Sequence, residues 1–422
     1  MFKTRIIKAL LAALWFMVLT FPIVGIQVNT TARNINWRWD RIASMGIGIF
    51  VLALLWNWCF ERKALGLPII KKLPDSFHYS FNELQNRPLF KKGLPIAILA
   101  AMLLMPLVSS IYQTNIMISA MVYVILALGL NIIVGLAGQL VLGYAAFYAV
   151  GAYTYGLLYH YFGLTFWACL PLGGLAAVIA GFLLGLPVLG LRGDYLAIVT
   201  LGFGEIVRLL LLSQGDITGG PRGISNIPRP SFFGMKMTLD QVTNYTYYLV
   251  LAGVLITILV ISRLKNSRIG LALQALREDE IACEAMGINT TRIKLTAFML
   301  CSCWAGFAGV IFAAKTTYLN PASFTFMDSA MILSMVVLGG MGSISGVVLA
   351  AMLLILAPEY LRAFSEYRML LFGAVMVLMM IFRPQGIIAG AHRDYHISEN
   401  IREKASPEDE EGNADSAERA SA

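Results

Sequence analysis

The chain has 422 residues, of which 58% are hydrophobic and only 13% are charged, and its mean hydropathy is +0.72. Soluble globular domains carry about 25% charged residues, so this composition excludes a soluble globule. The formal net charge of +8 fits basic loops held at one membrane face and gives no reason to infer nucleic-acid binding.

Apolar runs of nearly the length needed to cross hydrocarbon recur along the chain. A transmembrane helix takes about 20 residues. The runs lie at 6–26, 42–60, 94–112, 117–136, 166–186, 247–261 and 295–314. This pattern predicts an all-α polytopic membrane protein with about ten transmembrane helices, including a broken or re-entrant Gly-rich segment.

The first run could be a signal peptide or a retained helix, because Lys3, Arg5 and Lys8 precede its apolar core. That core continues for about 20 residues without a small-residue cleavage site, which favours a retained helix. We therefore divide the chain into an N-terminal extension at 1–95, with two transmembrane helices and a basic loop, and a membrane core at 96–390.

Basic residues set the expected orientation, since Lys and Arg near span ends stay on the cytoplasmic side. The segments 61–92 and 262–294 are rich in both, so we place them and both chain termini in the cytoplasm. The connection at 213–243 is rich in Gly and Pro, as expected of an ordered extracytoplasmic loop. The tail at 397–422 carries eight acidic and three basic residues, and we predict that it is disordered.

A cluster of glycines predicts a break in one span. Gly339, Gly340, Gly342 and Gly346 fall within eight positions, and each lowers helix propensity by about 1 kcal/mol. Irregular backbone persists at membrane depth only inside protein or against a water-filled cavity. The three glycines at 339, 340 and 342, with Ser343, are therefore candidates for a translocation path.

A second glycine-rich stretch follows Asn131. Gly135, Gln139, Gly143 and Phe147 are four apart, so they share one helix face if the region is helical. Small residues at this spacing fit close helix packing. The amides of Asn131 and Gln139 need polar partners, either on a neighbouring helix or in a translocation path. Asn131, Gln139 and Gly143 are path candidates on this ground.

Ionisable residues near spans are functional candidates. Arg192 and Asp194 stand where a helix should begin, a position at which Asp ordinarily acts as a cap. Glu205 lies three residues before Arg208, which permits an internal ion pair as well as a role in a translocation path.

The sequence contains no convincing motif for a catalytic site or a nucleotide-binding site. The segment 342–346 matches the G-x-S-x-G nucleophile elbow, but that motif needs a preceding strand, and its flanks here are apolar runs. The four histidines, His78, His160, His392 and His396, share no motif with an acid. No G-x-x-x-x-G-K-[ST] run occurs, so any ATP-driven process requires a separate ATPase.

A charged island at 277–287 interrupts the apolar part of the chain. A short helix with this mixture of acidic and small residues could dock into a groove on a soluble partner, and a solvated cytoplasmic loop is the alternative. Its candidate contact residues are Arg277, Glu278, Asp279, Glu280, Ala282, Glu284, Ala285 and Gly287.

Six motifs in fixed order carry a family resemblance. They are GLAGQLVLG from Gly135, LRGDYLAIVTLGFGE from Leu191, TGGPRG from Thr218, RIG from Arg268 with the charged island, GGMGS from Gly339 and FRPQG from Phe382. The ordered set is far more specific than any single motif. Over about 115–390 the chain resembles the permease family of branched-chain amino acid ABC importers, and its LivM-type members most closely.

The resemblance implies a permease core at 96–390 that moves leucine, isoleucine or valine across the bacterial inner membrane. It implies as partners a sister permease of the LivH type, two cytoplasmic ATPases of the LivG and LivF types and a periplasmic binding protein. ATP and Mg²⁺ would bind to the ATPases, and no cofactor is expected in this chain. The island at 277–287 would carry a coupling helix, and we expect Glu280→Arg to uncouple ATP hydrolysis from uptake.

Two alternatives stay open. Permeases for other small solutes, such as urea or amides, share this architecture. A secondary transporter would need an ionisable residue near the middle of the bilayer, and Glu205 is the strongest candidate in the predicted spans.

Overall fold

The computed structural model describes residues 100–360 except 107–108, 192 and 231–237, together with scattered residues before 100 and a few after 360. The chain divides into two compact units, Met1–Ala101 and Met102–Ala422. The predicted loop at 61–92 and tail at 397–422 lie outside the described residues, as does almost all of the predicted span at 42–60.

The first unit contains a short antiparallel hairpin that the sequence analysis did not anticipate. Strand β1 (Ile26–Asn29) pairs with β2 (Asn34–Trp37), and Ile26 lies opposite Trp37. Apolar and polar residues alternate in both strands, as a half-covered hairpin requires. The two strands are a small addition to a fold that is otherwise helical.

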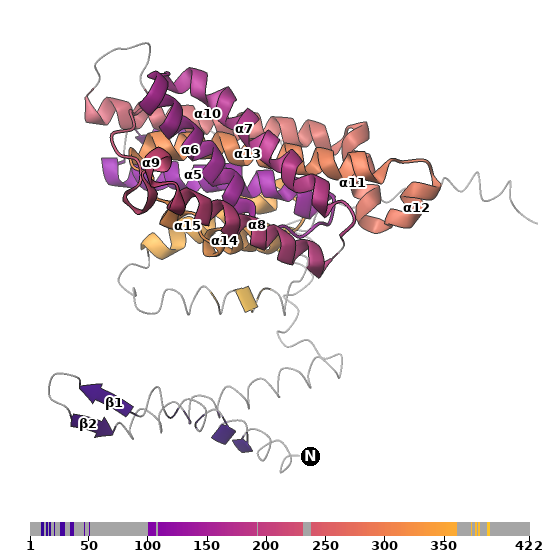
Figure 1. Cartoon of the computed structure of the whole chain (residues 1–422), viewed down its shortest axis with the longest axis horizontal. Coiled ribbons are helices and arrows are strands. Elements are labelled where there is room, and N and C mark those ends of the chain that lie inside the picture. Colours follow the sequence, from indigo (N-terminus) through magenta and orange to yellow (C-terminus); the bar gives the residue numbers. More distant parts are fainter. Residues whose placement is uncertain are drawn as a thin grey trace, which may run out of the picture. The chain divides into compact units, whose positions relative to one another are not determined.

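The second unit is a bundle of helices (Figure 1). Its longer helices are α5 (Ile111–Asn131), α6 (Tyr144–Phe162), α7 (Phe166–Val188), α8 (Asp194–Ser213), α10 (Leu239–Lys265), α13 (Thr290–Thr316), α14 (Phe326–Gly339) and α15 (Ile344–Tyr360). The shorter elements are the π-helix η2 (Ile132–Leu136), α9 (Gly215–Thr218), the 3₁₀ turns η3 (Gly220–Arg222) and η4 (Pro321–Ser323), α11 (Arg268–Glu278) and α12 (Glu280–Ala285).

Six helical segments of the described part are long and apolar enough to cross a membrane. Four of them match predicted runs, because α5 with η2, α7, α10 and α13 cover the runs at 117–136, 166–186, 247–261 and 295–314. The other two are Asp194–Ser213 and Pro321–Gly339. The polytopic helical class is thereby confirmed, whereas the total of about ten spans stays a prediction.

Polar caps explain where several of these helices begin. Ser110 and Gln113 form a reciprocal capping box at the start of α5, which separates this helix from the apolar run before it. Thr325 and Asp328 form the same arrangement at the start of α14, where the Asp328 carboxylate accepts from the Thr325 backbone N–H at 2.9 Å. Both boxes satisfy N–H groups that a helix start leaves without partners.

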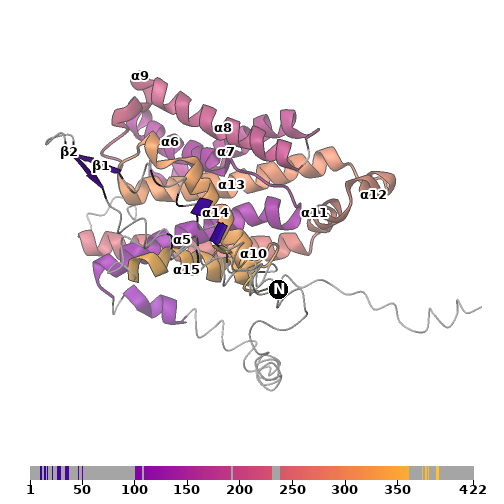
Figure 2. The ribbon, with the colours of Figure 1, turned by 90° about the horizontal axis from the view of Figure 1, so that it is seen from below.

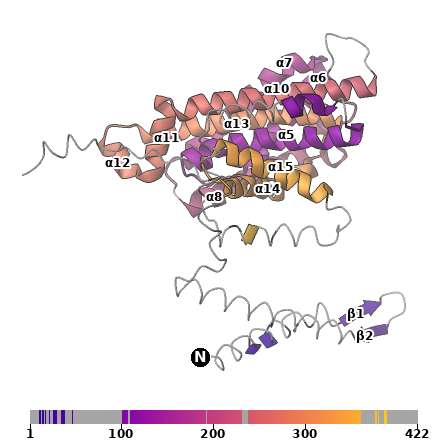
Figure 3. The same ribbon diagram turned by 180° about the vertical axis from the view of Figure 1, so that it is seen from behind.

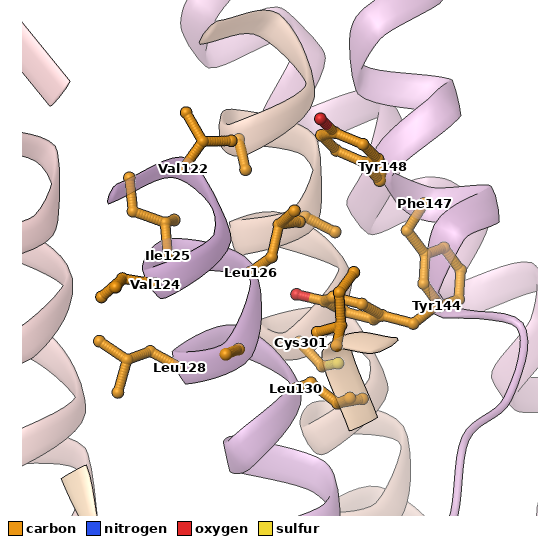
Figure 4. Packing of buried hydrophobic residues seen from close by; sticks show 14 of the residues in the cluster. Val122, Val124, Ile125, Leu126, Leu128, Leu130, Tyr144, Phe147, Tyr148 and Cys301 are labelled. Carbon is orange, nitrogen blue, oxygen red and sulfur yellow. The ribbon is translucent and has the colours of Figure 1, made fainter. Parts of the chain in front are cut away.

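Helix α13 lies at the centre of the bundle and packs along α6, α7 and α5. Glycines let these backbones approach closely, as is common between membrane helices. The buried core also includes large side chains, and Figure 4 shows the ring of Tyr144 on α6 directed toward Leu126 on α5 and Cys301 on α13. Tyr144, Leu126 and Cys301 are each at most 1% exposed.

The substitution Gly306→Ala is expected to destabilise this core. The added Cβ would lie 2.5 Å from the Gly173 carbonyl oxygen and 2.6 Å from the Ala177 Cβ, so α13 and α7 would have to separate. Overpacking of this kind costs about 1–3 kcal/mol, which thermal unfolding in detergent would register as a lower midpoint. Gly202→Ala on α8 is the matched control, because its added Cβ meets no atom within 4 Å.

The short elements gather at opposite ends of the bundle. Helices α11 and α12 project from one end, and α9 lies at the other (Figures 1 and 2). Figure 3 shows the α11–α12 end from behind. The segment 262–294 and the described part of 213–243, which were predicted to lie on opposite sides of a membrane, therefore lie at opposite ends of the bundle.

Candidate functional site

Helix α12 is a single exposed turn held by its own caps. Asp279 precedes it, and one carboxylate oxygen accepts from the backbone N–H groups of Ile281 at 2.8 Å and Ala282 at 3.1 Å. Gly287 ends the turn with φ +79°, a left-handed conformation that glycine adopts without strain. The buried Cys283 anchors the inner face of the helix.

Two of the four acids in the charged island, Glu280 and Glu284, contact residues at the start of α13. The Glu280 carboxylate pairs with the Lys294 ammonium on α13 at 2.6 Å, and Lys294 also donates to the Leu189 carbonyl at 3.3 Å. The Glu284 carboxylate accepts from the Thr290 hydroxyl at 2.9 Å. Lys294 is only 4% exposed, so these contacts hold α12 against the start of α13.

The outward face of α12 is apolar instead. Ile281 is 68% exposed and Met286 is 81% exposed, and the small residues Ala282 and Ala285 are exposed between them. Ile281 and Met286 were not among the candidate contact residues, which were chosen for charged or small side chains. The sequence feature that distinguishes them is that they are large apolar residues inside a charged segment.

Arg277 also turns inward, although part of its side chain is exposed. Its guanidinium donates to the Gly135 carbonyl at 2.8 Å, across 142 residues of sequence. Gly135 lies in η2, the π-helical end of α5. A π-helical turn leaves carbonyls poorly matched within the helix, and π-bulges frequently occur at functional sites.

The stretch 135–147 is not one helix, so the condition under which these residues would share a face is not met. The helix ends at Leu136, Gly138 has φ +69°, and α6 begins only at Tyr144. The irregular segment between them brings Gly143 against α8, where a Cβ on Gly143 would lie 1.9 Å from the Thr200 carbonyl oxygen. A bulkier residue at Gly143 could not fit beside α8.

The predicted break at 339–346 is present. Helix α14 ends at Gly339, α15 begins at Ile344, and Gly340 and Gly342 have φ +104° and +81°. Asn131 reaches this break from α5, where its side-chain oxygen accepts from the Gly342 N–H at 2.9 Å. Asn131 is 1% exposed, so its polar partner lies on a neighbouring segment.

Gln139 differs from Asn131. Its buried side-chain oxygen accepts no hydrogen bond from the described residues. A buried acceptor without a partner is costly unless water or a ligand satisfies it. Gln139 therefore stays a path candidate.

A small cavity of about 20 Å³, room for about one water molecule, lies between the starts of two helices and α8. The Ala145 N–H in the first turn of α6 donates to the Ser329 hydroxyl in the first turn of α14 at 2.8 Å, so the two helix starts meet. Helix α14 alone has 14 residues, about 21 Å of rise, and the candidate span Pro321–Gly339 is completed by η4 and the residues between η4 and α14. The cavity lining includes Gly143, Ala145, Gly204, Glu205, Phe324, Phe326 and Ser329.

Glu205 forms the internal ion pair that its spacing allows. Both of its carboxylate oxygens accept from the Arg208 Nε at 3.0 Å, and the two side chains are 43% and 25% exposed. Asp194 is the first residue of α8, and Gly193 occupies the cap position, so Asp194 does not cap through its side chain. Arg192 lies outside the described residues.

The path candidates thus form two groups. Gly143 and Glu205 line the cavity, whereas Asn131 and Gly342 meet near Gly135 at the α11 end of the bundle, where Arg277 of the charged island also makes contact. Gly339, Gly340 and Ser343 belong to the second group through the break they form.

At the α9 end, a hollow of about 420 Å³ opens among the connecting segments. It is lined by residues that include Tyr159, His160, Tyr161, Asp216 and Asn226. The Ile224–Leu319 bridge joins the loop after α8 to the loop after α13 beside it.

Comparison with known proteins gives a consistent result. A family described as "Branched-chain amino acid transport system / permease component" matches residues 112–380. The permease protein LivM of a high-affinity branched-chain amino acid transport system is 44% identical in Salmonella typhimurium and 45% identical in Escherichia coli K12, each over 91% of this chain and 95% of the relative.

A more distant relative is the permease protein LivH of the same kind of system in Escherichia coli K12, 23% identical over 63% of this chain and 91% of the relative. No solved structure matches this chain. The family match covers more than half of the chain, and the LivM proteins align over nearly its whole length. The chain is therefore a multi-pass membrane protein that belongs to the permease family of branched-chain amino acid transport systems.

Proposed function

We propose that this chain is one of two permease subunits of an ATP-driven importer that carries leucine, isoleucine or valine into the bacterial cytoplasm. The identity of 44–45% to LivM proteins over 91% of the chain is the observation that supports this most. The second permease would be a LivH-type subunit, since LivH proteins share the family with this chain.

Two cytoplasmic ATPases would bind ATP and Mg²⁺ and meet this chain at α12. The apolar outward face of that turn, made by Ile281, Ala282, Ala285 and Met286, suits a groove on another protein. Grouped exposed apolar side chains with a polar rim are a feature of protein–protein interaction sites. The inward contacts of Glu280 and Glu284 would keep α12 firmly attached to α13, so a force on α12 would reach the bundle.

The basic residues at one end of the bundle support an orientation in the membrane. The α11–α12 end carries the basic segment 262–294 and would face the cytoplasm, with both chain termini on that side of the inner membrane. The α9 end would receive a periplasmic binding protein loaded with the amino acid. The hollow beside His160 and Asp216 supplies a concave surface for that contact.

The cavity between α6, α8 and α14 would belong to the translocation path. Helices that begin inside the membrane direct the positive ends of their dipoles at a path, and transporters use such ends near their substrates. ATP moves a transporter between two states only when nucleotide binding favours one of them. The ATPases would therefore act through α12 on a path whose lining includes Gly143 and Glu205.

Affinity purification of the tagged chain from its native membrane, with mass spectrometry of the copurifying proteins, tests the assembly. We expect a second permease and two ATPases. Uptake of radiolabelled leucine, isoleucine and valine into proteoliposomes of the purified assembly, with ATP and binding protein supplied, then tests the substrate. A chain that purifies alone and transports would favour a secondary transporter, and uptake of urea or an amide alone would contradict the proposed substrate class.

A further inference from the structure

Three hydrogen bonds between distant parts of the chain meet where the two helix breaks lie. The Arg277 guanidinium donates to the Gly135 carbonyl at 2.8 Å, and the Lys265 ammonium donates to the Gly342 carbonyl at 2.9 Å. The Gly342 N–H donates to Asn131 at 2.9 Å. The partners are separated by 142, 77 and 211 residues, so the fold and not local sequence brings them together.

The two breaks are in direct contact. A Cβ on Gly135 would lie 2.5 Å from the Gly342 nitrogen, and a Cβ on Gly342 would lie 3.3 Å from the Gly135 carbonyl oxygen. The Arg277 stem passes over Gly138, where an added Cβ would lie 2.8 Å from the Arg277 Cγ. No larger residue at Gly135 would allow this approach without a shift of the backbone.

The charge of the two donors suits their acceptors. The end of a helix leaves carbonyls without intrahelical partners, and these carry partial negative charge. This applies to Gly135, which lies at the end of α5 with η2, whereas Gly342 lies in the turn between α14 and α15. A cationic donor at each position satisfies a carbonyl with a charge-assisted hydrogen bond, which is about twice as strong as a neutral one.

Both donors belong to one short unit that leads to α12. Lys265 is the last residue of α10, and Arg277 lies in the last turn of α11. The Gln274 side chain donates to the Lys265 carbonyl at 3.1 Å and braces α11 against the end of α10. Only Asp279 separates α11 from α12.

We propose that Arg277 and Lys265 are positioning residues that join α12 to the two helix breaks, so that displacement of α12 moves Gly135 and Gly342 together. This inference rests on the proposed function, in which α12 contacts an ATPase. Each break leads to the cavity: eight residues after Gly135 the chain reaches Gly143, and α14 connects Gly342 to Phe326 at its opposite end.

The test compares ATP hydrolysed per amino acid imported in proteoliposomes of the assembled transporter. We expect Arg277→Ala to raise that ratio about tenfold, within the usual range of coupling between sites, because the ATPases would still turn over while the breaks move less. Arg277→Lys should restore part of the coupling, since an ammonium can donate to the same carbonyl. Arg268→Ala, an exposed arginine on the same helix, is the matched control and should keep the wild-type ratio.

An assembled Arg277→Ala transporter with the wild-type ratio would overturn the inference. Should Arg277→Ala fail to assemble, Asn131→Ala decides the question: it removes the acceptor that joins the two breaks and leaves α11 and α12 intact. We expect a raised ratio for it as well, and an unchanged ratio would overturn the inference. Absence of ATP-dependent uptake by the wild-type assembly would instead contradict the proposed function itself, so the two failures are distinguishable.

Discussion

Replacing both Ile281 and Met286 with Asp is expected to abolish ATP-driven uptake, with a loss of at least about 100-fold. These side chains are the large apolar groups on the outward face of α12, at 68% and 81% exposure. Burial of one such side chain at an interface contributes about 1.5–3 kcal/mol, and two introduced carboxylates would have to be desolvated on docking. Copurification of the ATPases measures the loss of docking, and uptake in proteoliposomes measures the loss of transport.

The fold of the permease should survive this change, because neither side chain contributes to the buried core. The pair Ile281→Leu and Met286→Leu is the matched control, and it should keep both ATPase binding and uptake. Normal uptake by the double Asp variant would show that α12 is not the contact with the ATPases. Loss of folded protein, measured by size-exclusion chromatography in detergent, would show that the exposed face has a structural role.

Removing one member of the Glu205–Arg208 pair is expected to lower the amount of folded protein severalfold. The pair lies near the middle of α8, a helix long and apolar enough to cross a membrane. A single unpaired charge at the centre of such a helix costs about 2.5–3.5 kcal/mol on insertion scales. Glu205→Leu and Arg208→Leu should each show this loss in detergent extracts, and the double variant should recover most of the folded protein.

Uptake by the recovered double variant then distinguishes a purely structural role of Glu205 from a role in the translocation path. Because Glu205 lines the cavity between α6, α8 and α14, we expect the double variant to fold and still import poorly. Wild-type uptake would assign the pair a structural role alone. If the double variant gave as little folded protein as the single variants, an unpaired charge would not be the cause of their loss. Gly202→Ala, on the same helix and without close neighbours, controls for changes to α8 itself.

Apolar length and glycine content were enough to predict the helical class, the positions of four spans and the break before Ile344. These follow from local rules, because hydrocarbon requires continuous helical hydrogen bonding and clustered glycines lower helix propensity. The same rules did not decide whether 135–147 is one continuous helix. A spacing of four implies one face only when the helix continues, and here η2 and Gly138 end it.

For the charged island as well, the sequence predicted the position of the segment but not its side-chain contacts. Its place in the chain was evident from composition, but the direction of each side chain was not. Glu280 forms an ion pair with Lys294, and Arg277 donates a hydrogen bond to the Gly135 carbonyl. In each case the partner lies on another element. The tertiary structure was needed to show that Ile281 and Met286 form an exposed apolar face on α12.

The sequence by itself determined that this chain crosses a membrane several times, to which transporter family it belongs, and where helices break. Those properties depend on hydrophobic length, residue order and backbone propensity, all of which are local. The tertiary structure decided which breaks meet. Asn131, Gly135, Lys265, Arg277 and Gly342 converge because packed helices bring distant residues within hydrogen-bond distance, and the spacing of residues along the chain carries no record of that proximity.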